Sequence, residues 1–303
     1  MTRPHVVSPA ELSSLSDLEF IARTTVEGLR QGLHRSPFHG YSAEFAQYRH
    51  YRPGDDLKHV DWKLFGRSDR LYTRQFRETT NLSALLVLDA SASMAYPEAP
   101  AEGVAPASKF LVARAATAAL AALVIDQGDT AGVAAQGRDG VTYLPSRSGR
   151  HHLHAILAAL ARLSPGGAAP VSEVLRHAVA RLGRRGLVVV LSDFYDEPAS
   201  TDEVRRLARM GHEVVVVHVL SPEEVDLPET REVELEDLES GATRVVDPRE
   251  IRAAYRTAVS AFERRVERAV IAEGLDYLSI RSDRPLPEAL RAFLLRRRAR
   301  GAA

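Results

Sequence analysis

The sequence contains no cysteine, and only one of its 303 residues is a tryptophan. Without cysteine the chain can form no disulfide bond, offers no thiolate nucleophile and cannot hold a cysteine-ligated zinc ion. Neither sign of charge dominates, because 40 lysines and arginines balance 40 aspartates and glutamates. A protein that coats nucleic acid needs an excess of positive charge, so we expect no general nucleic-acid-binding function.

Long hydrophobic runs are also missing. The longest apolar runs have the length of strands, and the first ten residues (MTRPHVVSPA) lack the continuous apolar core of a signal peptide. We therefore expect no transmembrane segment and a cytoplasmic location. With 45% hydrophobic and 26% charged residues, the chain is long enough to bury the core of one large or two modest domains.

Two continuous apolar stretches predict strands that are buried on both faces of a sheet. The first covers residues 82–88 (LSALLVL) and ends at Asp89, and the second covers residues 186–191 (GLVVVL) and is followed by Ser192 and Asp193. Helical and strand-like segments continue this alternation, at residues 108–125, 171–182, 202–210, 213–220 and 275–280. The alternation predicts an α/β fold, with helices on both faces of a mostly parallel sheet.

Oxygen-bearing side chains follow the first of these strands. Asp89, Ser91 and Ser93 alternate with alanines in a loop at the carboxyl end of the strand, where open α/β sheets bind their ligands. We expect them to project from a solvent-facing strand end. One carboxylate and two neutral hydroxyls suit a hard cation such as Mg²⁺ or Mn²⁺, and leave the ion electrophilic toward an outside acidic group. The alternative is structural, with the same three residues capping the next helix.

An Asp-x-Ser-x-Ser sequence after a buried strand resembles the first motif of the von Willebrand factor A-type fold, whose metal site is the metal-ion-dependent adhesion site (MIDAS). The resemblance implies that a second carboxylate, Asp193, reaches the cation directly or through water. In that fold a threonine within a Gly-Gly-Thr sequence completes the site, whereas here Gly166 and Gly167 are followed by Ala168 and Ala169. We therefore expect a weak metal site that lacks one hydroxyl ligand.

A second informative segment, residues 44–62 (EFAQYRHYRPGDDLKHVDW), concentrates charges of both signs around a Pro-Gly turn and the single tryptophan. Its marked residues are Glu44, Arg49, Arg52, Gly54, Asp55, Asp56, Asp61 and Trp62. Opposite charges beside aromatic side chains predict a partly desolvated ion-pair network that ties this part of the chain to its neighbour. The alternative is a metal site built from the three aspartates and His59.

The same segment resembles the hallmark of the DUF58 family, which runs approximately G-x-x-x-S-x-x-x-G-x-x-x-E-F-x-x-x-R-x-Y-x-x-G-D-D-x-R-x-I-D-W. The match begins at Gly32 and ends at Trp62, with Lys58 in place of the usual arginine and Val60 in place of isoleucine. Two separate motifs in the right order make a chance match implausible, and the resemblance extends over roughly residues 20–298.

The two resemblances imply an N-terminal subdomain of helices and short strands over residues 1–80 and a von Willebrand A-like domain over residues 81–303. They also imply a non-enzymatic adaptor whose bound cation is completed by an acidic residue of a protein partner. The family resemblance implies that this partner is a MoxR-type AAA+ ATPase. The sequence contains no Gly-x-x-x-x-Gly-Lys-Ser/Thr phosphate loop, so any ATP hydrolysis would belong to the partner.

The alternative function is that of a magnesium-dependent phosphohydrolase of the haloacid dehalogenase type. Such enzymes also place an aspartate, here Asp89, at the end of their first strand, and the later sequence SDFYD at residues 192–196 resembles their second acidic motif. They normally carry a general acid, a second aspartate, two residues after the first. This chain has Ser91 there, and a serine is a poor proton donor to a leaving group, so we expect no enzymatic activity.

Overall fold

The computed structural model describes most of the chain. The described residues are 15–30, 43–52, 55–56, 60–78, 82–97, 107–167, 169–182, 185–228 and 230–301. Of the residues singled out above, Gly32, Gly54, Lys58, His59 and Ala168 lie outside this set, as does the side chain of Glu44. No helix in the described ranges is long and apolar enough to cross a membrane.

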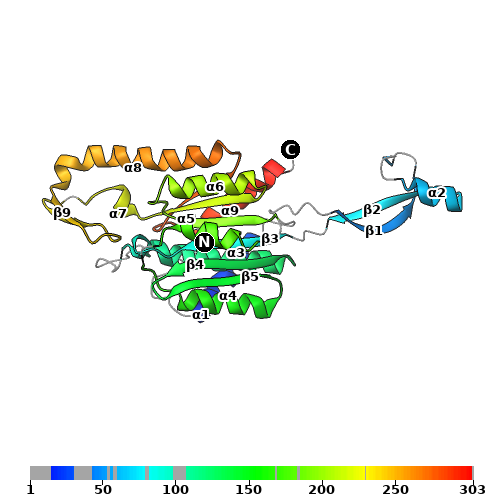
Figure 1. The fold of residues 1–303 in the computed structure, drawn as a ribbon, viewed down its shortest axis with the longest axis horizontal. Coiled ribbons are helices and arrows are strands. Elements are labelled where there is room, and N and C mark those ends of the chain that lie inside the picture. The colour runs from blue at the N-terminus through cyan, green and yellow to red at the C-terminus, as the bar shows by residue number, and fades with distance from the viewer. Residues whose placement is uncertain are drawn as a thin grey trace, which may run out of the picture. The chain divides into compact units, whose positions relative to one another are not determined.

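The larger part of the chain is built on a six-stranded sheet with the order β10-β7-β6-β3-β4-β5 (Figure 1). Its strands are β3 (Ser83–Asp89), β4 (Thr130–Gly137), β5 (Gly140–Arg147), β6 (Leu187–Ser192), β7 (Glu213–Leu220) and β10 (Asp276–Arg281). All neighbours pair in parallel except β4 and β5, which form an antiparallel hairpin. β3 and β6 lie in the centre and are buried along their whole length, because both are continuous apolar runs. The predicted α/β fold class is confirmed.

Helices cover both faces of this sheet (Figure 1). They are α1 (Leu15–Arg30), α3 (Lys109–Asp126), α4 (Arg150–Arg162), α5 (Val171–Val179), α6 (Ala199–Arg209), α8 (Pro248–Ile271) and α9 (Leu286–Gly301). One core joins α5, α6 and α8 to the face of β3 that carries Leu85 and Val87. Successive side chains of a strand point to opposite faces, so Leu86 and Leu88 face the other layer, where α3 packs against both the sheet and α1.

The chain divides into two compact units, one of residues 1–38 and 83–303 and the other of residues 39–82. Helix α1 groups with the sheet-bearing unit, which differs from the N-terminal subdomain expected for residues 1–80. It packs against α3, α4 and α9, because its apolar stripe is buried. The smaller unit is therefore an insertion between α1 and β3.

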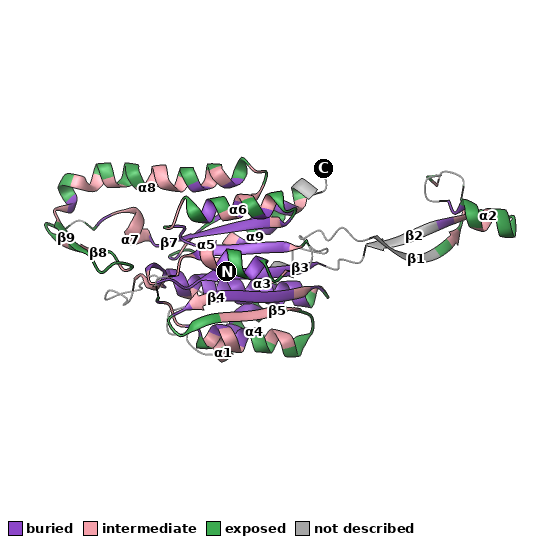
Figure 2. Ribbon diagram, viewed as in Figure 1, coloured by how far each residue is buried: buried purple, intermediate pink, exposed green. Residues whose placement is uncertain are grey.

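Shorter elements follow the strands of the larger unit. A 3₁₀ turn, η3 (Ser93–Ala95), comes after β3, and α7 (Pro222–Val225) comes after β7. Next in the chain is an antiparallel hairpin of β8 (Val233–Glu236) and β9 (Thr243–Val246). None of the residues in these two strands is buried, in contrast to the central sheet (Figure 2).

The smaller unit consists of β1 (Ala43–His50), α2 (Trp62–Ser68) and β2 (Tyr72–Glu78). Its two strands pair in antiparallel fashion, and an isolated bridge between Val60 and Thr73 extends the pairing toward α2. Val60 and Thr73 are buried, whereas Trp62 is 58% exposed.

Candidate functional site

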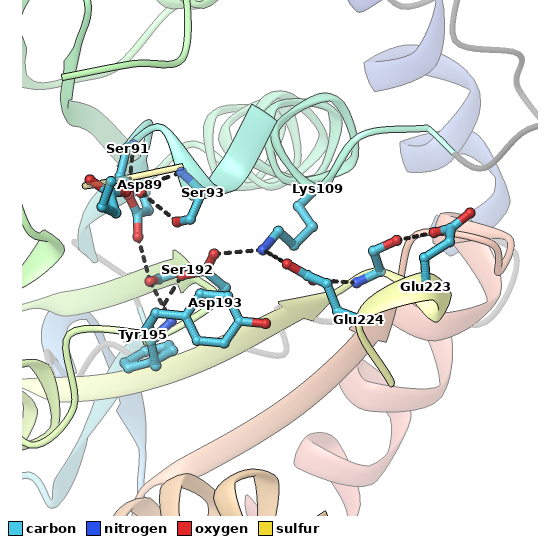
Figure 3. A network of polar contacts seen from close by, with 12 residues as sticks. Asp89, Ser91, Ser93, Lys109, Ser192, Asp193, Tyr195, Glu223 and Glu224 are labelled. Atoms are coloured by element: carbon cyan, nitrogen blue, oxygen red, sulfur yellow. Dashed lines mark hydrogen bonds and ion pairs between the residues drawn. The ribbon is translucent and has the colours of Figure 1, made fainter. Parts of the chain in front are cut away.

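Two polar strand ends meet at the carboxyl edge of the sheet, because β3 and β6 are parallel neighbours. Leu88 lies opposite Leu191 in their register, so Asp89 and Ser192, the next residue of each strand, come together. Asp193 follows directly, and Figure 3 shows both aspartates at this edge. The parallel pairing therefore brings together two polar motifs that lie about a hundred residues apart in the sequence.

Asp89 is a buried carboxylate with neutral hydrogen-bond partners. It is only 4% exposed, so the expectation of a solvent-facing position is wrong. Its Oδ1 accepts a hydrogen bond from the backbone N–H of Ser91 (2.9 Å), and its Oδ2 accepts one from the hydroxyl of Ser192 (2.5 Å). Burial, together with the negative charge of Asp193, raises the pKa of Asp89 to about 7. Within the described part of the chain, Asp89 forms no ion pair.

Ser91 and Ser93 lie in the same loop as Asp89, with their hydroxyl oxygens 3.1 Å apart. Both serines are buried, and η3 begins at the second of them. The next long helix, α3, begins only at Lys109 and is capped by the hydroxyl of Ser108. The alternative in which Asp89 and the two serines cap that helix is therefore wrong.

A buried lysine occupies the other half of the site. Nζ of Lys109 donates to Oδ2 of Asp193 (2.7 Å) and to Oε1 of Glu224 (2.5 Å), and it lies 4.6 Å from the ring centroid of Tyr195 (Figure 3). The side chain of Lys109 is fully buried. Burial lowers the pKa of Lys109, but the two carboxylates together raise it by more than burial lowers it. The pKa of Lys109 therefore lies above its ordinary value. Lys109 therefore keeps its charge at neutral pH.

Glu224 is held in place by the short helix that carries it. In the capping box of α7, the N–H of Ser221 donates to Oε2 of Glu224 (3.1 Å), and the hydroxyl of Tyr255 on α8 donates to the Glu224 carbonyl (2.7 Å). Burial raises the pKa of Glu224, and the charge of Lys109 opposes that rise. The only hint of this cluster in the sequence is a single lysine at the start of a mostly apolar, alanine-rich helix.

The turn of the β8–β9 hairpin also reaches the site. Oε1 of Glu239 accepts a hydrogen bond from the N–H of Ser93 (3.1 Å), although the two residues lie 146 positions apart. Glu239 itself is exposed, and its turn is tied by the side chain of Asp237. No sequence motif points to Glu239, because an exposed glutamate in an acidic turn looks like an ordinary solvated residue.

The loop of Gly166 and Gly167, where the expected threonine is missing from the sequence, lies beside the Asp89 loop. The N–H of Gly166 donates to the carbonyl of Ala90 (2.8 Å), between Asp89 and the first serine. Gly166 and Gly167 have φ values of 137° and 88°, a region that residues with a side chain rarely adopt. Ala168 lies outside the described residues, so the weak metal affinity expected from its missing hydroxyl stays a prediction.

In the smaller unit, part of the predicted ion-pair network is present. Nη2 of Arg49 donates to Oδ1 of Asp55 (2.7 Å), and both side chains are partly buried. The N–H of Arg52 donates to Oδ2 of Asp55 (2.9 Å). This backbone hydrogen bond, followed by the hydrogen bond and charge of Arg49, lowers the pKa of Asp55. Asp56 and the side chain of Arg52 are exposed, so water screens the charge at these two positions of the segment.

Asp61 is the N-cap of α2. Its Oδ1 accepts hydrogen bonds from the N–H groups of Lys63 and Leu64 (both 3.0 Å), and its Oδ2 accepts one from the hydroxyl of Tyr48 (2.9 Å). These contacts satisfy backbone donors at the start of the helix, which explains why a buried aspartate stands there.

Comparisons with known proteins agree with the sequence motifs. The family model described as "Protein of unknown function DUF58" matches residues 47–265. An uncharacterized protein of Mycobacterium tuberculosis (strain ATCC 25618 / H37Rv), Rv1480, is 32% identical over 304 residues, which cover 98% of this chain and 93% of the relative.

Solved structures with a similar arrangement include BatB from Bacteroides thetaiotaomicron, described as a conserved hypothetical protein. It is 17% identical, with a TM-score of 0.42, and the match covers 72% of this chain and 99% of that one. The SpRpn10 VWA domain is 13% identical, with a TM-score of 0.40, and the match covers 69% of this chain and 94% of that one. TM-scores this low carry no argument about function. The family match and the full-length relative do decide the family, and this chain belongs to the DUF58 family.

Proposed function

We propose that this chain is a non-enzymatic protein-interaction module, an adaptor, whose binding site is formed by Asp89, Ser91 and Ser93. A divalent cation held there, Mg²⁺ or Mn²⁺, would offer a coordination position to an acidic residue of a partner. The observation that carries the proposal is the buried carboxylate of Asp89, which forms no ion pair in the described ranges. A carboxylate taken out of water is costly unless a positive charge compensates it.

The donor atoms fit a hard cation, with one change from the sequence-based ligand set. Among the described residues, no group of three or more histidines, cysteines, aspartates and glutamates is placed to hold a metal ion, so the serine hydroxyls are essential to such a site. Asp193, predicted as a ligand, is hydrogen-bonded to Lys109. We therefore give the ligand role to Asp89, Ser91 and Ser93, and a supporting role to Asp193.

The groups around Asp89 favour the binding of an acidic ligand to a cation at this site. The hydrogen bonds from Ser91 and Ser192 fix both oxygens of Asp89. The ammonium group of Lys109 compensates Asp193, so that a second bare carboxylate does not repel an incoming acid. The two neutral hydroxyls add donor oxygens without adding negative charge.

We further propose that the partner is a MoxR-type AAA+ ATPase and that the two proteins meet in the cytoplasm. Membership of the DUF58 family supports this partner, and the lack of a phosphate loop in this sequence leaves ATP hydrolysis to it. The phosphohydrolase alternative has less support. The Ser91 hydroxyl shares a hydrogen bond with the Ser93 hydroxyl, and the general acid of such enzymes has no counterpart at that position.

Calorimetric titration with Mn²⁺ tests the site. We expect the native chain and the control Asp139→Asn, in the exposed turn between β4 and β5, to bind the ion alike. Asp89→Asn should lose at least about tenfold in affinity, because it removes the only charged ligand. If Asp89→Asn binds Mn²⁺ as the native chain does, the proposed site is wrong.

Capture of a purified MoxR-type ATPase tests the function. We expect capture by the native chain in Mg²⁺, and loss of capture in EDTA or with Asp89→Asn. Equal capture with and without EDTA would contradict a metal-bridged mechanism. Without the ATPase, neither the native chain nor Asp89→Asn should show Mg²⁺-dependent hydrolysis of p-nitrophenyl phosphate. Hydrolysis by the native chain that Asp89→Asn abolishes would favour the phosphohydrolase alternative.

A further inference from the structure

We propose that Glu239 is an internal acidic ligand of the site formed by Asp89, Ser91 and Ser93, which a partner's carboxylate must displace. The inference rests on the proposed function, because it names the group that competes for the same site. Its starting point is the hydrogen bond from the N–H of Ser93 to Oε1 of Glu239 (3.1 Å), which joins the β3 loop to the β8–β9 turn.

The contact with Glu239 lies in the loop that carries the proposed ligands. Ser93 belongs to the loop of Asp89, and its hydroxyl lies 3.1 Å from that of Ser91. A carboxylate held on the Ser93 N–H therefore stands at the loop where the proposed function brings a partner's acid. Glu239 offers the same chemical group, a carboxylate on a short exposed turn, that such a partner would present.

The turn is built to present Glu239 in a defined position. The side chain of Asp237 accepts hydrogen bonds from the N–H of Glu239 (2.9 Å) and from the hydroxyl of Ser240 (2.6 Å). The N–H of Gly241 donates to the carbonyl of Asp237 (2.7 Å), and the φ of Gly241 is 71°, which favours glycine. A tip organised in this way loses little conformational freedom when Glu239 binds.

The two strands of the hairpin contribute no buried residues. Each of its strands has four residues, and none of these is buried. An isolated two-stranded hairpin is marginally stable at best, and elements with few buried contacts are those that open locally. A competing carboxylate would therefore have to break the Glu239 contact but no hydrophobic core.

Hydrogen exchange read by mass spectrometry on the full chain tests the contact. The variants are Glu239→Ala and, as a matched control, Glu236→Ala, which removes another exposed glutamate of the same hairpin. A hydrogen bond to a charged group corresponds to about a tenfold change in an equilibrium constant. Exchange at the Ser93 amide should rise about tenfold in Glu239→Ala and stay at the native rate in Glu236→Ala.

A second arm uses acetate, in the presence of Mn²⁺, as the simplest carboxylate probe. Acetate should raise exchange at residues 237–241 of the native chain, and it should bind Glu239→Ala several-fold more tightly than the native chain. Equal Ser93 exchange in the native chain and Glu239→Ala overturns the inference, and so does equal acetate affinity when both chains bind Mn²⁺. If the native chain binds no Mn²⁺ while Glu239→Ala still exposes the Ser93 amide, the proposed cation fails and the internal ligand stands.

Discussion

Asp89 ends one strand of the sheet and Asp193 follows its neighbour, and both are almost fully buried, but among the described residues only Asp193 has a cation beside it. The ammonium group of Lys109 bridges Asp193 and Glu224, so each of these two carboxylates has a positive charge within hydrogen-bond distance. The hydrogen bonds that Asp89 accepts from described residues come from neutral donors, and its pKa rises to about 7. A permanent side-chain cation thus stabilises one half of the site. The other half stays uncompensated, so an exchangeable cation has the most to contribute there.

The largest effect should come from Lys109→Met, which removes the compensated half. It leaves Asp193 and Glu224 buried without a cation, and breaking such a buried pair costs about 3 to 5 kcal/mol in free energy of unfolding. Thermal melting should show a large fall in Tm, whereas the control Lys63→Met, at an exposed position on α2, should leave Tm nearly unchanged. Similar melting of the two variants would mean that Lys109 does not compensate these carboxylates.

Asp89→Asn removes the uncompensated charge instead. The folded-state pKa of about 7 lies above the ordinary value of 3.8, so the folded chain holds this proton more tightly than the unfolded chain does. The contribution of Asp89 to stability therefore falls as pH rises from about 4 to about 7.

In EDTA, Asp89→Asn should raise the free energy of unfolding at pH 8 by at most about 4 kcal/mol, and by much less at pH 4. Urea denaturation at both pH values checks this. A gain that is the same at both, or a loss at pH 8, would count against a buried, uncompensated Asp89.

Ser192→Ala sharpens the comparison by removing a neutral donor from Asp89. The hydroxyl of Ser192 donates to Oδ2 of Asp89 and accepts from the N–H of Phe194 (2.8 Å), so its loss leaves a buried N–H without that acceptor. We expect a cost of about 1 to 2 kcal/mol in urea denaturation at pH 8. In Ser192→Ala combined with Asp89→Asn the cost should be smaller, since the charged acceptor is already gone; equal costs in the two backgrounds would show no coupling.

The smallest effect should come from an ion pair near the surface of the smaller unit. Arg49 and Asp55 are both partly exposed, so water already solvates part of their charge. Arg49→Ala should cost at most about 1 kcal/mol. Arg52→Ala is the control, because Arg52 contacts Asp55 through its backbone N–H, which the substitution keeps. Thermal melting that ranks Arg52→Ala as the more damaging change would contradict this assignment.

Local patterns were enough to predict the framework of the site. The continuous apolar runs of β3 and β6 predict buried strands, because a segment buried on both faces needs no polar side chains. Asp89, Ser91 and Ser93 follow one strand within five residues, so their common loop needs no knowledge of the fold. The division of the chain was harder to predict, since the amphipathic stripe of α1 shows that it packs but does not show on what.

The sequence by itself therefore determined the parallel sheet, the polar loop at its carboxyl edge and the hallmark segment of the family. Only the tertiary structure decided the electrostatics of the site. Lys109 meets Asp193 across 84 positions and Glu224 across 115, and Glu239 meets Ser93 across 146. In a linear sequence such residues look like ordinary polar surface groups. Their effect depends on which charges packing brings together and how much water it removes, and no local pattern encodes either.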